Sequence, residues 1–296
     1  MLFAVIDVGS NAARLLFANA YGDIDNISVE KATLIRIPLR LGKDVFSKGK
    51  ISKEKEKNFI KTMKAYKLLM DVYKPKGFRA CATAAMREAS NSKKIVDSIK
   101  KHTGIELEII PGAEEASIIR NTNRIVFKKP DRLTIFIDVG GGSTEISAQK
   151  NGELIKLKSF MIGTIRLLND EYDKNVWTEI NEWLLEFKTD FNKMNVVGSG
   201  GNINKINKLF GKKNNIFLNI KDLKNSEEIL SKMTLQERMN KYGMREDRAD
   251  VIVPAAKIYI KIMNIIEAKH IAVPKIGLAD GMVHQLYRQY LLSNND

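Results

Sequence analysis

A glycine-rich turn is the part of this sequence that most clearly suggests chemistry. In the stretch FIDVGGGSTEIS, residues 136–147, an apolar run ends at Asp138 and is followed by three glycines and two hydroxyl residues. Glycines there let backbone N–H groups point outward with no Cβ in the way. Such a nest of amides suits an oxyanion, of which phosphate is the usual one. The predicted phosphate-binding residues are Gly140, Gly141, Gly142, Ser143 and Thr144.

A second form of the same phrase opens the chain, as FAVIDVGSNAARLLF at residues 3–17. Gly9, Ser10 and Asn11 repeat the turn, and Asp7 takes the place of Asp138. Since either aspartate alone would repel phosphate, we interpret both as holders of Mg²⁺ or of a water molecule. A lone run of glycines more often only shapes a hairpin. Its repetition after a second buried strand favours two turns that hold one phosphate from both sides.

The two turns lie within matching series of predicted elements. Each half reads as a buried strand, a turn after Asp-Val-Gly, a second strand and a third strand, and Asn151-Gly152 is a strong hairpin signal. Strands alternating with helices, given twice, predict two α/β lobes of similar plan with a cleft between them. The predicted strands are 2–7, 14–20, 26–37, 77–82, 105–110, 133–137, 143–149, 153–160 and 195–198, and the clearest helices are 53–72, 176–191, 249–267 and 280–292.

Three further candidates have two explanations each. The SGGN stretch at 199–202 stands at a helix start, where free N–H groups favour an anion, but glycines are common there. Arg87 lies one turn after Thr83 in ATAAMRE and is either a phosphate ligand or a surface arginine. Glu114 and Glu115 stand in the first turn of a helix. On the residues alone, stabilisation by the helix dipole is the better explanation of both glutamates.

The composition limits the class of protein. A chain of 296 residues accommodates two domains, and its 44% hydrophobic content with no long apolar run predicts neither a membrane span nor a membrane partner. The single cysteine, Cys81, and the lack of a secretory signal predict a cytoplasmic protein. With three histidines, a zinc site is not expected. The net charge of +14 fits either attraction of a polyanion or a lysine-rich surface that maintains solubility.

Eight segments, taken in order, resemble the Ppx/GppA phosphatases, which are exopolyphosphatases and guanosine pentaphosphate phosphatases. The segments are DVGSNAARL, ATAAMREASN, PGAEEA, IDVGGGSTEIS, IGTIRL, GSGGN, RADVIVPAA and IGLADG. The resemblance implies two duplicated ribonuclease H-like lobes of the actin/sugar-kinase/heat-shock ATPase superfamily, in a short two-domain form. We expect a first lobe over 1–126 and a second over 127–296, with the boundary near 124–130. The helix at about 280–296 is expected to pack back on the first lobe.

The resemblance also implies a reaction, the hydrolytic release of the terminal phosphate of inorganic polyphosphate with Mg²⁺. Compared position by position, Glu115 matches the proposed general base, which reverses the judgement made from the residues alone. Asp138 and Glu145 match the acidic residues around the metal. The matched phosphate-binding positions are Gly9, Ser10, Asn11, Arg87, Gly141, Gly142 and Ser143.

Some questions stay open at this point. The first motif departs from the family pattern because Ala12 stands where a hydroxyl residue is usual, so one phosphate hydrogen bond is missing. Guanosine pentaphosphate is the alternative substrate, and a nucleotide- or alarmone-binding switch protein is the alternative class. A monovalent cation such as K⁺ is a further candidate cofactor, and a homodimer a further candidate assembly. The sequence holds no DNA-binding motif.

Overall fold

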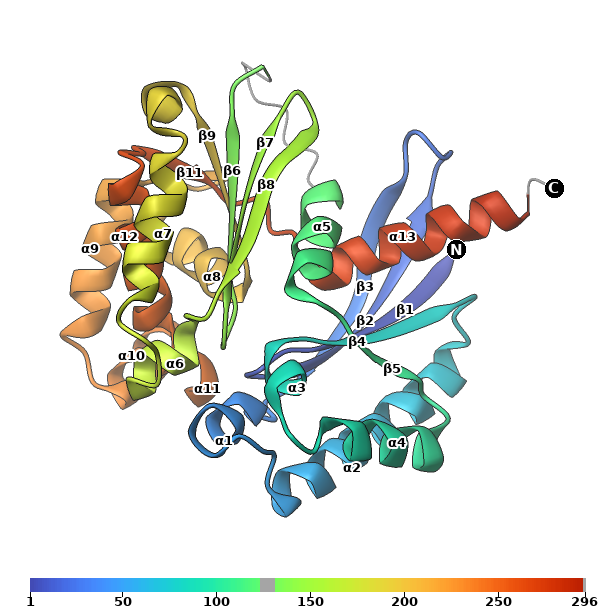
Figure 1. The fold of residues 1–296 in the computed structure, drawn as a ribbon. Helices are drawn as coiled ribbons and strands as arrows, with labels where there is room; N and C mark the ends of the chain where they lie inside the picture. Colours follow the sequence, from blue (N-terminus) through green and yellow to red (C-terminus); the bar gives the residue numbers. More distant parts are fainter. Residues whose placement is uncertain (123–130, 295–296) are drawn as a thin grey trace. The chain divides into compact units, whose positions relative to one another are not determined.

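The computed structural model describes residues 1–122 and 131–294, which fall into two compact units. One unit comprises Met1–Thr122 together with Leu278–Asp296, and the other comprises Asn123–Gly277. The boundary predicted at 124–130 lies outside the described residues. Each unit contains one mixed sheet with helices packed on it, so the predicted α/β class is confirmed (Figure 1).

The N-terminal unit has a five-stranded sheet in the order β3-β2-β1-β4-β5. The first three strands pair antiparallel, while β4 and β5 run parallel to β1. The strands are β1 Leu2–Val8, β2 Ala13–Tyr21, β3 Ser28–Ile37, β4 Phe78–Ala82 and β5 Leu107–Ile109. The helices are α1 Leu41–Lys48, α2 Lys53–Tyr73, α3 Ala84–Glu88, α4 Ser92–Thr103, α5 Gly112–Thr122 and α13 Leu278–Ser293.

Both faces of this sheet are covered. In β1, Ala4, Ile6 and Val8 belong to the cluster formed with α1, α2 and α4, whereas Phe3 and Val5 belong to the cluster formed with α5 and α13. Successive side chains of a strand point to opposite faces, which explains this alternation. Helix α13 therefore closes the second face although it comes from the end of the chain (Figure 1).

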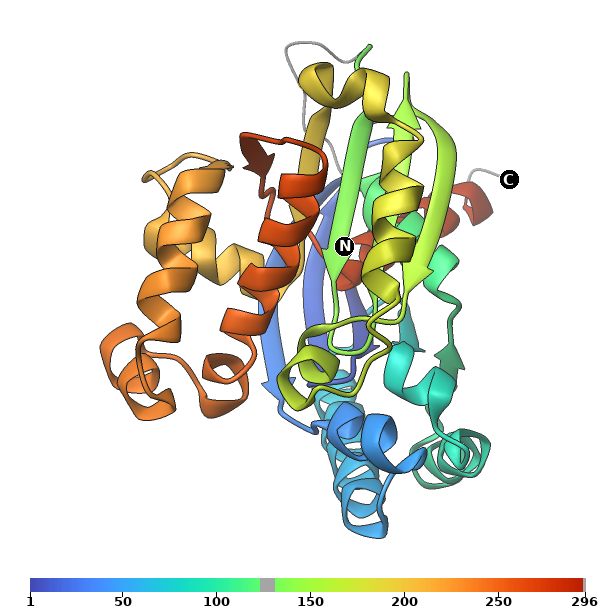
Figure 2. The same ribbon diagram turned by 60° about the vertical axis from the view of Figure 1, so that its left-hand side comes forward.

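The C-terminal unit has a six-stranded sheet in the order β10-β11-β9-β6-β7-β8. Its strands are β6 Thr134–Val139, β7 Thr144–Lys150, β8 Glu153–Phe160, β9 Asn195–Ser199, β10 Phe217–Asn219 and β11 His270–Ala272. Its helices are α6 Thr164–Asn169, α7 Val176–Leu185, α8 Gly201–Phe210, α9 Ile220–Ser231, α10 Leu235–Tyr242, α11 Glu246–Ala249 and α12 Ile252–Ile265, with a 3₁₀ helix η1 at Lys188–Lys193. Helix α12 packs between α7 and α9 (Figure 2).

The two units share one plan. Three antiparallel strands in sequence are followed by a strand parallel to the first, as β1-β2-β3 with β4 and as β6-β7-β8 with β9. The predicted strands in both halves are confirmed to within a few residues. The predicted hairpin turn is also confirmed, since Asn151 and Gly152 both have positive φ, at 52° and 84°. Across residues 1–122 and 131–294, no helix has both the length and the apolar character that a bilayer crossing requires.

Tyr66 of α2 provides a test of the core of the N-terminal unit. Its side chain is 1% exposed, and its hydroxyl donates to the carbonyl oxygen of Ala13 at 3.0 Å. The change Tyr66→Phe removes that donor and leaves a buried carbonyl less well satisfied. We expect the free energy of unfolding, measured by urea titration, to fall by about 1 kcal/mol. Tyr73→Phe is the matched control because Tyr73 is 41% exposed. Equal losses in the two variants would contradict the assigned role of the hydroxyl.

Candidate functional site

The N-terminal turn joins β1 to β2 through Gly9, Ser10 and Asn11. The amide of Gly9 donates to Ala12 O at 3.0 Å and closes the turn. The start of α1 holds it from outside, because Gly42 N donates to Ser10 O at 2.8 Å. Ser10 is 3% exposed, and within the described residues its Oγ has no hydrogen-bond partner. An unsatisfied buried hydroxyl costs about 1–3 kcal/mol, so Ser10 Oγ is available to a bound water molecule or a polar ligand.

Ala12 and Asp7 affect the hydrogen-bond donors and the charge that this turn offers to a ligand. Ala12 is 1% exposed, so its methyl group is packed in the core, and it offers the turn no hydroxyl donor. Asp7 lies directly opposite Arg14 on the neighbouring strand, and Arg14 Nη1 donates to Asp7 Oδ2 at 2.6 Å. The charge of Asp7 is therefore compensated within the unit. Its predicted role as a metal ligand stays a prediction, and Arg14 is a contact that the sequence reasoning missed.

Glu115 and Arg87 meet inside the N-terminal unit. Arg87 is carried by α3, which follows β4 directly, and its Nη1 donates to Glu115 Oε2 at 3.0 Å and to Ile110 O at 2.9 Å. Thr83 precedes α3 but makes no side-chain capping hydrogen bond. Glu115 is 9% exposed. Arg87 thus fixes the direction of a nearly buried carboxylate.

The neighbouring Glu114 points elsewhere. Its Oε1 accepts from Arg79 Nη2 at 2.8 Å, and the same guanidinium contacts Glu108 at 2.7 Å and Gln285 of α13 at 2.9 Å. The Glu114 side chain is 42% exposed, against 12% for that of Glu115. The helical period separates adjacent residues by about 100°, which explains why the two glutamates have different surroundings.

Two carboxylates lie side by side in the C-terminal unit. Asp138 near the end of β6 is paired in register with Glu145 of β7, and their carboxylate oxygens lie within 4.8 Å of one another. The next pair back, Ile137 and Ile146, is buried in the core cluster, so strand alternation puts the two acids on the opposite face. Ser199 donates to Asp138 Oδ1 at 2.5 Å.

Glu145 is 2% exposed and is held by hydroxyl groups. Its Oε1 accepts from Ser143 Oγ at 2.6 Å and from Ser159 Oγ at 2.8 Å. Two close carboxylates favour a bound cation, because each raises the cost of ionising the other. Their hard oxygen atoms are the ligand type that Mg²⁺ and Ca²⁺ prefer, so this pair fits a metal of that kind.

The glycine turn of the C-terminal unit has its carbonyl groups occupied. Gly140 O accepts from Thr164 N at 2.9 Å, Gly141 O accepts from Ile165 N at 2.9 Å, and Gly142 O accepts from Arg166 Nε at 2.8 Å. In the part of the chain that the structure describes, the amides of Gly141 and Gly142 make no hydrogen bond. Buried backbone amides without partners are rare, and Gly142 is buried while Gly141 is half-buried. Two of them in one turn, beside two carboxylates, can take the oxygen atoms of an anion.

Gly163 makes this arrangement possible and was not recognised from the sequence. A Cβ at residue 163 would lie 2.5 Å from Gly141 C and 2.6 Å from Gly142 N. Only glycine therefore lets the start of α6 approach the turn closely enough to occupy its carbonyl groups. The signal was present in the sequence, since Gly163 stands directly before Thr164 in MIGTIRLL.

The hydroxyl groups of the C-terminal turn have local roles. Thr144 is fully buried and donates to Ile162 O at 2.6 Å, while Ser143 donates to Glu145. These bonds fix the turn and the carboxylate. The predicted phosphate contacts of the two hydroxyl groups stay predictions. The structure thus brings together Asp138, Glu145 and the glycine turn in one unit, and Glu115 with Arg87 in the other.

Comparison with known proteins gives consistent matches. A model described as the Ppx/GppA phosphatase family matches residues 24–289. Exopolyphosphatase 1 of Mycobacterium leprae is 25% identical over 305 residues, covering 96% of this chain and 88% of that protein. The bifunctional 3-dehydroquinate synthase/phosphatase of Fusobacterium nucleatum is 29% identical over 221 residues, which cover 68% of this chain but only 33% of that longer protein.

Solved structures extend the match to the fold. The crystal structure of an exopolyphosphatase from Cytophaga hutchinsonii has a TM-score of 0.81 and 25% identity, with 97% of each chain covered. The predicted two-lobe fold and the predicted resemblance are both confirmed. With the family model extending from β2–β3 to α13, and the same fold in a solved relative, the chain belongs to the Ppx/GppA phosphatase family.

Proposed function

We propose that this protein is an exopolyphosphatase that releases the terminal phosphate of inorganic polyphosphate, with Mg²⁺ held by Asp138 and Glu145 and with Glu115 as general base. One observation carries the proposal. Two glycine amides without a hydrogen bond lie in the turn that joins β6 to β7, and these strands carry the paired carboxylates Asp138 and Glu145. Amides attract an anion and carboxylates attract a cation, and a magnesium-bound phosphate supplies both. A relative named as an exopolyphosphatase, aligned over most of both chains, supports the choice of substrate.

The N-terminal turn supplies the second set of phosphate contacts in this proposal. Ser10 Oγ, which is buried and unpartnered within the described residues, donates to a phosphate oxygen. Asn11 and the neighbouring amides add further donors. When bound, Mg²⁺ neutralises negative charge on the phosphate oxygens. Donors fixed in advance around the developing charge lower the barrier more than mobile water would.

Glu115 acts on the attacking water. Its contact with Arg87 supports this role, because the guanidinium fixes the direction of the carboxylate. The water oxygen forms a bond to the terminal phosphorus as the bond from that phosphorus to the bridging oxygen breaks. The water proton passes to Glu115, and the shortened chain leaves with the bridging oxygen.

A substrate comparison tests the proposed function. Purified protein is incubated with long-chain polyphosphate, guanosine pentaphosphate or ATP, with and without Mg²⁺, and the released phosphate is measured. We expect the fastest release from polyphosphate and none without Mg²⁺. Preference for guanosine pentaphosphate would assign the same groups to the other activity of the family. Absence of release from all three would favour a binding protein and reject the proposal.

The Glu115→Gln variant is expected to lose most of its turnover and to keep its affinity for the substrate. General-base assistance is typically worth about 10²–10⁴-fold, so kcat should fall by about that factor. Because the glutamine side-chain oxygen can still accept from Arg87, the fold and the substrate dissociation constant should change little. Glu114→Gln is the matched control, since the adjacent carboxylate faces Arg79 instead. Equal effects of the two substitutions on kcat would remove Glu115 from the mechanism.

Asp138→Asn is expected to raise the Mg²⁺ concentration that gives half-maximal rate. The amide keeps the shape of the side chain and removes the charge, so we expect a rise of about 10–100-fold. The measurement is a titration of rate against Mg²⁺ at saturating polyphosphate. Asp170→Asn is a suitable control because Asp170 is exposed and asparagine tolerates its left-handed backbone, at φ 55°. An unchanged titration in Asp138→Asn would exclude this carboxylate as a ligand.

A further inference from the structure

We propose that a stripe of exposed lysines on α2 binds the distal part of an extended polyphosphate chain. The stripe is defined as Lys53, Lys57, Lys61 and Lys64. This inference rests on the proposed exopolyphosphatase function and locates a second contact region for the same substrate. Such a contact would make the affinity for polyphosphate depend on the length of the polyphosphate chain.

Positive charge is concentrated in this part of the N-terminal unit. Residues 40–67 contain ten Lys or Arg and three Asp or Glu, an excess of seven out of the net +14 of the whole chain. Two of the three acids, Glu54 and Glu56, lie in the first turn of α2, where the helix dipole stabilises them. The rest of α2 towards residue 64 is therefore strongly basic.

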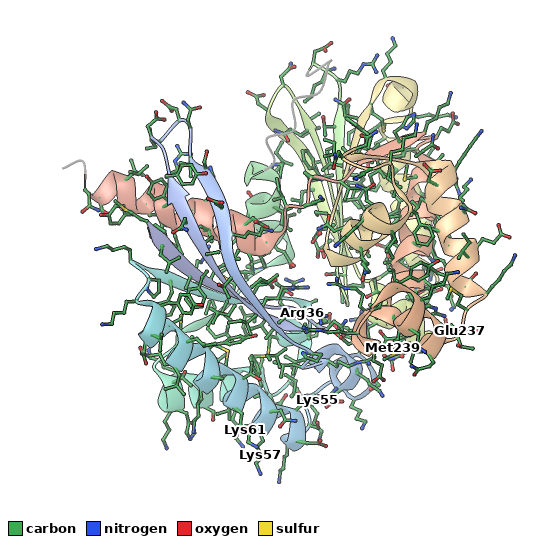
Figure 3. All side chains as sticks on the ribbon, turned by 180° about the vertical axis from the view of Figure 1, so that it is seen from behind. Arg36, Lys55, Lys57, Lys61, Glu237 and Met239 are labelled. Atoms are coloured by element: carbon green, nitrogen blue, oxygen red, sulfur yellow. The ribbon has the colours of Figure 1, made fainter. Side chains whose placement is uncertain are left out.

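The four lysines lie along one side of the helix. Their spacings of four, four and three residues match the helical repeat, so they form a row about 16 Å long. All four are exposed, while Phe59, Met63 and Tyr66 on the opposite side are buried in the core. Figure 3 shows Lys57 and Lys61 extending outward from α2. A row of cations on a rigid helix is complementary to a linear polyanion.

The four lysines are not engaged in ion pairs with the part of the protein that the structure describes. Among the described residues, none of the four has a carboxylate within 4.0 Å. Some exposed lysines elsewhere do, as in Lys156 with Glu186 at 2.5 Å and Lys158 with Glu179 at 3.0 Å, whereas others such as Lys212 and Lys213 form no ion pair with a described carboxylate. A surface that served only for solubility would gain from interspersed signs of charge. What distinguishes the stripe is its regular spacing along one side of a helix, which suits an external linear anion.

The stripe is connected to the N-terminal phosphate turn within the same unit. Arg40 N donates to Asn11 O at 2.9 Å, and Lys55 Nζ in the first turn of α2 donates to Arg40 O at 2.5 Å. Lys55 also pairs with Asp44 of α1 at 2.7 Å. The start of α2 is therefore fixed beside the turn proposed to hold the terminal phosphate. A chain leaving that turn can continue along the helix.

The test measures binding directly, without Mg²⁺ so that no turnover is needed. Long-chain polyphosphate is titrated against the wild-type protein and against Lys53→Gln/Lys57→Gln/Lys61→Gln/Lys64→Gln at several salt concentrations. We expect the variant to bind the long chain at least about tenfold more weakly at low salt. Its slope of log affinity against log salt should fall by about one for each lysine that contacts phosphate. Tripolyphosphate, which is shorter than the row of about 16 Å, should bind the two proteins with nearly equal affinity.

A matched set of changes controls for net charge. Lys212, Lys213, Lys221 and Lys224 of the C-terminal unit are exposed, and their replacement by glutamine removes the same four charges. If the control set weakens long-chain binding as much as the stripe set, general charge is responsible and the proposal is wrong. Tighter stripe-dependent binding of a single-stranded RNA of equal charge would also overturn it. If the wild-type protein does not hydrolyse polyphosphate but its binding still depends on the stripe, the proposed function is wrong and the binding site on α2 is retained. If hydrolysis is observed but the stripe variant binds the long chain as tightly as the wild type, only the binding site on α2 is rejected.

Discussion

The proximity of two carboxylates is the constraint on which the site depends. Asp138 and Glu145 face one another across an antiparallel strand pair, on the side of the sheet away from the core of their unit. Three serine hydroxyl groups donate to them, from Ser143, Ser159 and Ser199. Neutral donors reduce the repulsion but do not remove the charge, so the pair is suited to a cation. The glycine turn between the two strands then offers amides to whatever anion accompanies that cation.

The two units repeat one fold but not one chemistry. In the C-terminal unit the strand-end acid lies opposite another acid, whereas in the N-terminal unit Asp7 lies opposite Arg14. The same topological position therefore carries a negative pair in one copy and a neutral pair in the other. Divergence at a single cross-strand partner is enough to explain this difference, because residues directly opposite each other in a sheet interact most strongly. A duplicated fold thus provides two turns of the same plan but only one pair of facing carboxylates.

Much of this arrangement is readable in the sequence because it depends on local patterns. Strand alternation, the Asn151-Gly152 hairpin and the repeated Asp-Val-Gly turn are each set by near neighbours, and β1 to β9 were predicted to within a few residues. The three-residue strands β10 and β11 were not predicted, because they are too short to show a pattern. Contacts between distant segments were not predictable in the same way. Glycine is required at residue 163 only because Gly141 lies against it. The Thr144 hydroxyl donates to the Ile162 carbonyl oxygen, 18 residues away in the sequence. Apolar periodicity likewise could not show which of Glu114 and Glu115 is the more buried carboxylate. Their surroundings are set by distant residues, since Glu114 pairs with Arg79 and Glu115 pairs with Arg87.

The return of α13 to the first unit has a consequence for synthesis of the protein. Phe3, Val5 and Leu16 form one cluster with Met282, Val283 and Tyr287, and the Tyr287 hydroxyl donates to Gly22 O at 2.8 Å. Because α13 follows the whole C-terminal unit in the sequence, this face of the N-terminal sheet is not fully covered until α13 has been synthesised. Until then α5 alone covers part of that face, and the remaining apolar surface favours aggregation of the incomplete chain.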